Sequence, residues 1–220
     1  MDKRFLAVVA AIILLFVGIA VFNRDDSADT ANTGGSSGRP TNHIKGKADA
    51  SVTLVEYGDF QCPVCRIYEP TVNQVVEKYG DRIKFQFRHF PLQQIHENAL
   101  AGSRAAEAAG LQGKFWEMHD LLYNNQDVWS RSATPQSTFE QFAKSLSLNT
   151  EQYKKDFTSS KVNNAVNADL AEGAKLEITG TPAFFLNGKA IPNKQLADDQ
   201  NQPQLDKFSK LIDEALAAKQ

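Results

Sequence analysis

Hydrophobic and polar residues divide the chain into three stretches of different character. Residues 5–22 contain no charged or strongly polar side chain, and thirteen of these eighteen residues are Leu, Ile, Val or Phe. Residues 23–45 are rich in Gly, Ser, Asp and Asn, so they bury too little apolar surface to order themselves. Residues 46–220 carry strand and helix patterns almost throughout. The pattern predicts one globular domain joined by a flexible linker to an apolar segment.

The apolar segment has the length needed to cross a membrane. As a helix, its residues 5–22 would span about 27 Å at about 1.5 Å per residue. Residues 1–4 include two basic side chains, whereas Arg24 is followed by two aspartates. The positive-inside rule then places residues 1–4 in the cytoplasm. We expect a single-pass transmembrane anchor in the cell membrane with the domain extracytoplasmic. A secretory signal, cleaved or uncleaved, is the alternative, and it exports the same domain.

Strand and helix patterns follow one another in a clear order within the domain. Residues 52–57 form an apolar run with apolar side chains on both faces, which is typical of a central strand. A helical pattern up to residue 79 and an alternating strand at 83–89 come next. Residues from about 95 to 178 are mainly helical, and the chain then returns to strand, an Asn-Gly hairpin and a final helix. The order predicts an α/β domain interrupted by a helical insertion.

Composition and charge exclude some classes of function. Apolar residues make up 42% of the chain and charged residues 23%, and the formal net charge is −2. No basic run is present, so nucleic-acid binding is not expected. The apolar group Phe115, Trp116 and Met118 is interpreted as core, and no cofactor is expected.

The chain has only two cysteines, Cys62 and Cys65, and they lie between the first clear strand and its helix. A thiolate at Cys62 would face unpaired N–H groups and the positive end of the helix dipole. Pro63 suits the first helical turn, because that position needs no hydrogen-bond donor and a fixed φ. Cys62 is therefore predicted to be the nucleophile of a redox dithiol and Cys65 its buried partner.

Two other interpretations of the cysteine pair are less favourable. A structural disulfide across two intervening residues closes so short a loop that it adds little stability. A zinc site needs about four ligands, and the four histidines, His43, His89, His96 and His119, show no finger-like spacing. No metal is expected at the pair. His89 is interpreted as a packed or hydrogen-bonded core residue.

Glu56 stands on a largely apolar face of the first clear strand, six residues before Cys62. We interpret it as a partly buried carboxylate that moves protons to and from Cys65. An exposed glutamate at the end of the strand is the alternative.

Several dispersed motifs resemble the DsbA-like family of exported thiol–disulfide oxidoreductases, which have a thioredoxin fold with an inserted helical domain. The similarity covers about residues 46–220. It is carried by Glu56, Asp59-Phe60, Cys62-Pro63-Val64-Cys65, Phe87-Arg88-His89-Phe90-Pro91-Leu92, Gly113-Lys114-Phe115-Trp116-Glu117 and Gly180-Thr181-Pro182. The resemblance implies that the Thr181–Pro182 peptide bond is cis. It also implies that Pro182 faces the two sulfurs and keeps metal away from them. The Thr181 backbone would then be free to pair with an extended substrate.

Val64 departs from the family pattern, because the best-studied members have histidine at this position. Valine neither carries charge nor donates a side-chain hydrogen bond. The reduced form should therefore be less stabilised and the protein a weaker oxidant.

The resemblance and the dithiol lead to one main expectation about function. We expect an oxidase that introduces disulfides into exported proteins with free thiols and is reoxidised by a membrane-embedded, quinone-linked partner. One alternative is a disulfide isomerase or reductase supplied with electrons by a membrane donor. The other, from a different class, is a redox-silent peptide-binding chaperone module.

Overall fold

The computed structural model describes residues 38–219. The predicted transmembrane segment, residues 5–22, lies outside this range. Between residues 38 and 219, none of the helices combines the length and the apolar character that a membrane span requires.

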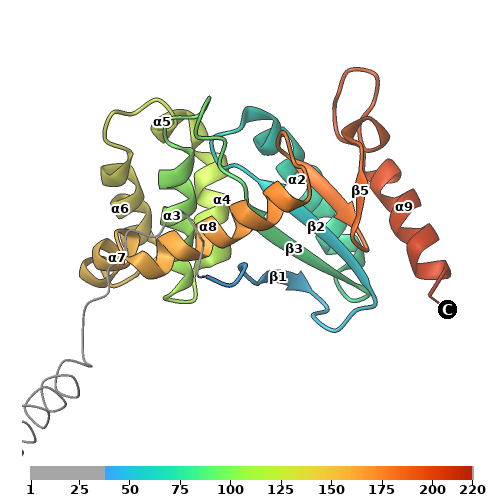
Figure 1. The fold of residues 1–220 in the computed structure, drawn as a ribbon, viewed down its shortest axis with the longest axis horizontal. Coiled ribbons are helices and arrows are strands. Elements are labelled where there is room, and N and C mark those ends of the chain that lie inside the picture. Colours follow the sequence, from blue (N-terminus) through green and yellow to red (C-terminus); the bar gives the residue numbers. More distant parts are fainter. Residues whose placement is uncertain (1–37, 220) are drawn as a thin grey trace, which may run out of the picture. The chain divides into compact units, whose positions relative to one another are not determined.

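A mixed five-stranded sheet forms the centre of the domain (Figure 1). Its strands lie in the order β1 (His43–Gly46), β3 (Ile83–His89), β2 (Val52–Gly58), β4 (Ala183–Leu186) and β5 (Lys189–Ile191). β2 pairs parallel with β3, and the remaining neighbours are antiparallel. β2 is therefore the middle strand, as its apolar residues on both faces predict.

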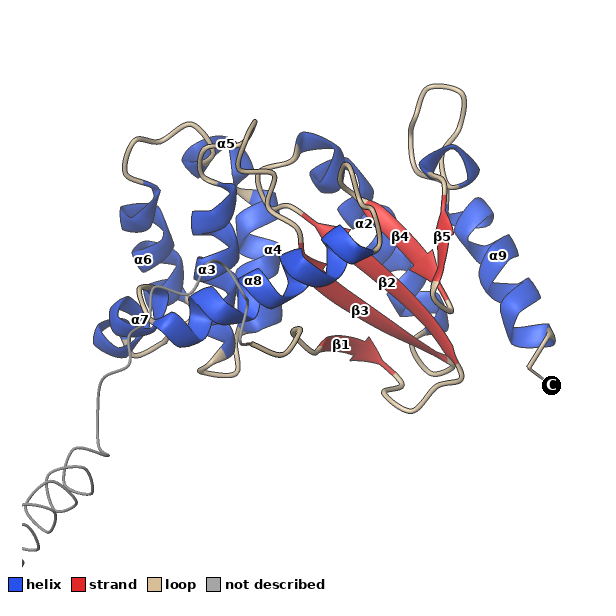
Figure 2. Ribbon diagram, in the orientation of Figure 1, coloured by secondary structure: helices blue, strands red, loops and turns tan. Residues whose placement is uncertain are grey.

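Helices cover both faces of the sheet and the ends of two strands (Figure 2). α2 (Pro63–Tyr79) and α9 (Leu205–Ala217) pack on one face, and α8 (Ser160–Lys175) crosses the other. A helical block lies beyond the carboxyl ends of β2 and β3 (Figure 1). It consists of α3 (Ala99–Gly110), α4 (Phe115–Asn124), α5 (Gln126–Trp129), α6 (Pro135–Ser145) and α7 (Thr150–Phe157). The short 3-10 helix η1 (Asn193–Gln195) follows β5.

Two large groups of buried side chains hold these layers together. One lies under α2 and α9 and is formed by apolar side chains of the sheet and both helices, among them Leu54, Val75 and Phe208. The other joins the helical block to the ends of the strands and contains both cysteines. The dithiol is therefore placed where the sheet and α2 meet the helical block.

The ordered domain begins earlier than the hydropathy pattern predicts. That pattern places residues 23–45 in a flexible linker, yet β1 pairs with β3. Thr41 is buried, and its N–H and its hydroxyl donate hydrogen bonds of 2.7 and 2.6 Å to the carboxylate of Asp169 on α8. The linker prediction is therefore wrong for residues 38–45. The reason is that backbone pairing and hydrogen bonds to a distant carboxylate order this segment. A hydropathy pattern contains no information about either kind of contact.

Candidate active site

Both cysteines lie at the start of α2, directly after the loop that leaves β2. Cys62 is the N-cap residue with an extended backbone, and Pro63 occupies the first helical turn. Both cysteines are free thiols and both are buried, with 4% of Cys62 and none of Cys65 exposed. The predicted order of strand, cysteine pair and helix is confirmed, and Cys62 is the sulfur closer to solvent.

The loop between β2 and Cys62 is held by the carboxylate of Asp59. This side chain is fully buried and accepts hydrogen bonds from the N–H groups of Gln61 and Leu92 at 2.8 and 2.9 Å. It also lies 2.7 Å from Nδ1 of His96. A loop anchored from three directions gives Cys62 a defined position.

The loop before β4 brings Thr181 and Pro182 to the dithiol. Their peptide bond is cis, which confirms the expectation from the resemblance. The Sγ atom of Cys62 lies 3.4 Å from the carbonyl oxygen of Thr181, so the thiol form can donate a hydrogen bond to it. A pocket of about 260 Å³ flanks the same loop and is lined by Ile178, Pro182 and Ile191, among other residues. The cis-proline loop thus borders both the sulfur and a cavity.

The surroundings of Cys62 favour its thiolate. A hydrogen bond from the Cys65 thiol is the largest contribution that lowers the pKa of Cys62, and burial opposes it. The Thr181 side chain and the backbone N–H groups of Cys65 and Val64 lower it further, to about 6. The Cys62 side chain makes no regular cap hydrogen bond. Val64 therefore contributes through its backbone N–H group.

Cys65 shows the opposite shift. Burial raises the pKa of Cys65 well above its usual value, and the neighbouring Cys62 and Glu56 raise it further. At neutral pH the pair therefore holds a thiolate at Cys62 and a thiol at Cys65. The role of Cys62 as nucleophile and of Cys65 as its partner stays a prediction, and this difference in pKa is the property that such a pair requires.

Glu56 is a buried carboxyl group beside the dithiol. It is 2% exposed, and its Oε2 atom has no hydrogen-bond partner within residues 38–219. Burial raises the pKa of Glu56 well above its usual value, with further contributions from Glu69 and Cys62. The alternative of an exposed glutamate at the strand end is wrong. Burial thus favours the protonated form of this carboxyl group, whose charge also raises the pKa of Cys65.

Sequence reasoning missed three residues that complete the surroundings of the cysteines. Gln126 on α5 is buried, and its side-chain amide donates hydrogen bonds of 2.8 and 3.0 Å to the carbonyl oxygens of Phe60 and Cys62. Glu69 on α2 raises the pKa of Glu56. The Tyr123 hydroxyl is buried with no partner among the residues that the structure describes. No local motif marks these residues, because their importance depends on contacts between distant segments.

Gly58 makes room for this arrangement at the end of β2. A Cβ atom at this position would lie 2.4 Å from the Phe87 ring and 3.0 Å from the Tyr123 hydroxyl. Both neighbours are buried, so a larger residue would displace the packing between the sheet and the helical block.

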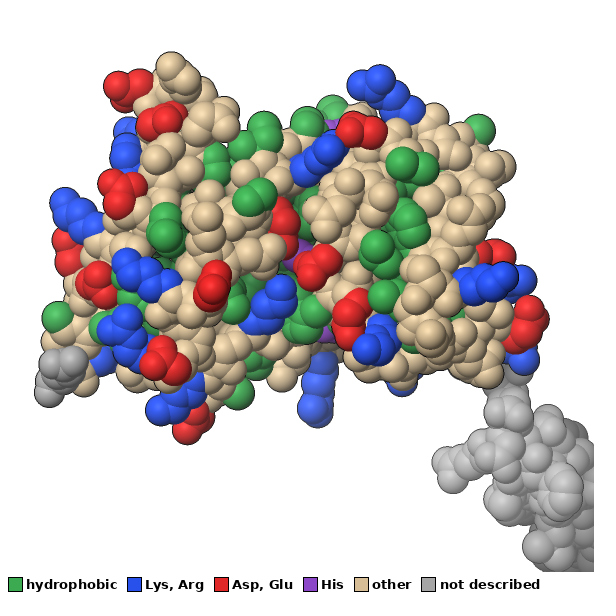
Figure 3. Space-filling model, turned by 180° about the vertical axis from the view of Figure 1, so that it is seen from behind, with side chains coloured by type: hydrophobic (Ala, Val, Ile, Leu, Met, Phe, Trp, Pro, Cys, Tyr) green, Lys and Arg blue, Asp and Glu red, His purple; other side chains and the backbone are tan. Residues whose placement is uncertain are grey.

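Exposed apolar side chains lie close to Cys62 along α2. Val64 is 42% exposed and Ile67 44% exposed, so an approaching chain would meet apolar surface there. On the face seen in Figure 3, Lys and Arg side chains are interspersed with Asp and Glu between hydrophobic patches. Among the described residues, the groups of side chains that could hold a metal ion include neither cysteine. His89 is fully buried and lies 2.7 Å from Glu107, as expected of a hydrogen-bonded core residue.

A Cys-x-x-Cys pair on a helix N-terminus, in contact with a cis-proline loop at the end of a mixed sheet, defines the thioredoxin-fold thiol–disulfide oxidoreductases as a class. The family model described as thioredoxin matches residues 38–214. A probable disulfide bond formation protein D from Bacillus cereus is 33% identical over 183 residues, which cover 80% of this chain and 79% of that protein.

Solved structures share the fold of this chain. Oxidised BdbD from Bacillus subtilis has a TM-score of 0.66 at 25% identity, and the match covers 82% of this chain and 97% of that one. Wolbachia pipientis α-DsbA1 has a TM-score of 0.67 at 21% identity, covering 81% of this chain and 92% of that one. The chain belongs to the DsbA-like family of thioredoxin-fold thiol–disulfide oxidoreductases.

A second kind of relative shares only part of its length with this chain. The Na(+)/H(+) antiporter NhaA 1 of Mycolicibacterium gilvum is 36% identical over 198 residues, which cover 86% of this chain and 31% of the antiporter. The chain thus spans about a third of that relative.

Proposed function

We propose that this protein is an extracytoplasmic disulfide oxidase, which introduces disulfides into exported proteins through Cys62 and Cys65. The observation that carries the proposal is the opposite shift of the two thiol pKa values, with that of Cys62 lowered to about 6 and that of Cys65 raised. A stabilised thiolate at Cys62 stabilises the reduced form of the pair. Oxidising strength follows that stabilisation.

The exchange runs in two steps that conserve electrons. A substrate thiolate attacks Sγ of Cys62 in the oxidised pair, which forms a mixed disulfide and releases Cys65 as a thiolate. A second substrate thiolate then attacks the substrate sulfur of the mixed disulfide and displaces the Cys62 thiolate. The substrate gains a disulfide, and the Cys62–Cys65 pair gains two electrons. Cys62 is the better leaving group, because its pKa is the lower of the two.

Glu56 fits the role of proton donor in the first step. The Cys65 thiolate is released in a fully buried position and needs a proton, since burial raises its pKa. The buried carboxyl of Glu56, with its own pKa raised, can supply that proton and recover it in the reverse reaction.

We place the domain outside the cytoplasm, with residues 5–22 as its membrane anchor. The apolar length of that segment and the basic residues before it support this placement. Reoxidation would then come from a quinone-linked protein in the same membrane. The apolar side chains of Val64 and Ile67, together with the pocket beside Pro182, offer a surface for an extended substrate.

The direct test mixes the oxidised full chain with a reduced peptide that contains two cysteines. We expect the peptide to be oxidised and the protein to be reduced in equal amounts. Thiol alkylation and mass spectrometry measure both changes. Cys62→Ser should abolish the exchange, and the reduced Cys65→Ser variant, mixed instead with the oxidised peptide, should accumulate a mixed disulfide through Cys62. Ser137→Ala, an exposed change on α6, serves as the control with unchanged activity. A Cys62→Ser variant that oxidises the peptide at the parent rate would disprove the proposal.

Two further measurements separate the alternatives. A mostly oxidised Cys62–Cys65 pair in living cells supports an oxidase, whereas a mostly reduced pair supports an isomerase or reductase. Replacing both cysteines with serine removes every thiol-exchange activity. A peptide-binding chaperone module would keep its function in vivo in that double variant.

A further inference from the structure

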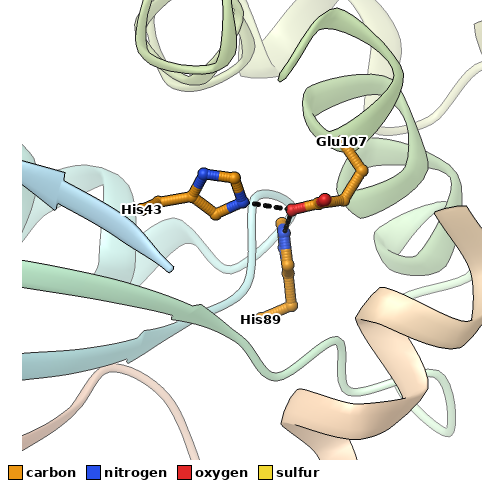
Figure 4. Close-up of side chains that lie close together, drawn as sticks. All are labelled: His43, His89 and Glu107. Carbon is orange, nitrogen blue, oxygen red and sulfur yellow. Dashed lines mark hydrogen bonds and ion pairs between the residues drawn. The ribbon is translucent and has the colours of Figure 1, made fainter. Parts of the chain in front are cut away.

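Three side chains from three separate elements converge at the edge of the sheet next to the helical block (Figure 4). His43 comes from β1, His89 from the end of β3 and Glu107 from α3. The two imidazoles point toward the same carboxylate, and their Nε2 atoms both contact its Oε1 atom, at 2.7 Å in the case of His89. This cluster takes no part in the thiol chemistry described above.

The three ligand atoms are close enough to bind a single ion. They all lie within 4.8 Å of one another. Around a tetrahedral zinc ion with bonds of about 2.0–2.2 Å, such atoms stand roughly 3.3–3.5 Å apart. The carboxylate of Glu107 would need to retreat from His89 by less than about 1 Å, which a small side-chain rotation provides.

The surroundings hold the rings in place and leave one side open. His89 is fully buried among Phe60, Phe87 and Phe115, with ring centroids at 5.9, 5.5 and 5.8 Å. His43 stacks on Phe115, and 17% of its side chain is exposed. An ion could thus enter from the His43 side, where water or a further ligand would complete its coordination.

We propose that His43, His89 and Glu107 form a binding site for a divalent first-row transition ion such as Zn²⁺. Two imidazole nitrogens and one carboxylate are a known ligand set for zinc, and imidazole also suits copper and nickel. Calcium and magnesium prefer oxygen ligands and are not expected here. The three residues stand far apart in the sequence, so spacing rules for metal motifs do not detect them.

The affinity of the site for an ion should be limited, because a residue that would bind the ion lacks a supporting hydrogen bond. Nδ1 of His89 is buried and has no hydrogen-bond partner within the described part of the chain, so packing alone sets the orientation of this ring. Loss of such an outer partner typically weakens metal binding about 10–100-fold. A bound ion would fasten β1 and the end of β3 to the helical block and so stabilise the fold. This inference does not depend on the proposed oxidase function.

The test uses the purified full chain with Cys62 and Cys65 oxidised, so that no thiolate competes for metal. The protein is stripped with a chelator and titrated with Zn²⁺ by calorimetry and with Co²⁺ by absorption spectroscopy. We expect one ion per chain, a Co²⁺ spectrum without thiolate bands, and a Tm that rises with Zn²⁺ concentration. Ca²⁺ should produce none of these effects.

Matched variants locate the ion. His43→Gln and Glu107→Gln should each weaken Zn²⁺ binding at least tenfold and remove the Tm increase. Gln at position 43 can still donate a hydrogen bond to Glu107, so this variant should fold. Asp120→Asn is the control, because Asp120, Glu69 and His119 form the other group that could hold a metal among the described residues. The proposal is overturned if Zn²⁺ does not bind, if His43→Gln binds it as the parent does, if Ca²⁺ binds equally well, or if Asp120→Asn alone loses it.

Discussion

The two large buried regions of this domain differ in chemistry. The region under α2 and α9 is formed by apolar side chains such as Leu54, Val75 and Phe208. The region between the strand ends and the helical block includes both cysteines, and buried polar groups such as Glu56 and His119 adjoin it. Leu54 and Glu56 lie two residues apart on one strand, and both are almost completely buried. A single strand therefore serves both regions.

This difference shows how the fold separates stability from reactivity. Burial of apolar area contributes about 25 cal/mol per Å², so the region under α2 and α9 stabilises the domain. Burial of titratable groups costs free energy, and it also shifts their pKa values. The pKa values of Cys62 and Cys65 shift in opposite directions, and both cysteines lie in the region between the strand ends and the helical block. We expect that substitutions in one region leave the property set by the other region unchanged.

The largest expected change in stability comes from the apolar region. Leu54→Ala should lower the free energy of unfolding by about 2–5 kcal/mol, because Leu54 is fully buried in the central strand. The pKa of Cys62 should stay unchanged. Urea unfolding and the pH dependence of alkylation measure the two effects, and Leu111→Ala, at a 39% exposed position, is the control. A Cys62 pKa that moved with stability would contradict the separation.

Glu56→Leu should have the opposite pair of effects in the reactive region. The variant should be more stable by about 1–3 kcal/mol, since a buried oxygen without a partner is removed. Peptide oxidation should slow on the order of 10²-fold, because proton transfer to Cys65 is lost. Urea unfolding and rapid-mixing kinetics test this. A variant that is less stable and fully active would refute the proton-donor role.

The reactivity of the reduced protein should follow the lowered pKa of Cys62. Alkylation of Cys62 should be half-maximal near pH 6 and fall about tenfold for each pH unit below that. Cys65 should be labelled only at alkaline pH, since its pKa is raised. Mass spectrometry of the labelled peptides distinguishes the two sites, and faster labelling of Cys65 at pH 6 would reverse the assigned roles.

The same shift makes the stability of the reduced form depend on pH. The folded-state pKa of Cys62 is depressed below its unfolded value, so the stabilisation is complete above the unfolded pKa. It is lost as the pH falls through about 6. The oxidised form has no thiol to titrate. The stability of the reduced form relative to the oxidised form should therefore decrease from pH 9 to pH 5 in thermal unfolding experiments, and the absence of such a trend would argue against a stabilised thiolate.

The smallest expected effect concerns the Thr181 hydroxyl. The Thr181 side chain lowers the pKa of Cys62. Thr181→Val should raise that pKa by about half a unit to one unit, where one unit corresponds to about 1.4 kcal/mol. The protein should become a slightly weaker oxidant in glutathione titrations. Thr179→Val, an exposed change in the same loop, should leave the potential unchanged.

Local pattern alone determined much of the architecture. The central strand, the cysteine pair and the following helix are contiguous, so hydrophobic periodicity and the properties of Pro63 are sufficient to predict their arrangement. The return to strand at β4 follows in the same way from the apolar run after Pro182. The resemblance carried by dispersed motifs supplied the cis bond and the family, both confirmed.

Only the tertiary structure decided which distant groups meet at the dithiol. Thr181 and Gln126 reach Cys62 from segments far along the chain, and the burial of Glu56 depends on the helices that cover its strand. Residues 38–45 are ordered by pairing with β3 and by Asp169, although their own composition resembles a linker. A sequence pattern reports which face of an element is apolar. Desolvation and hydrogen bonding, which shift pKa values, depend on what packs against that face.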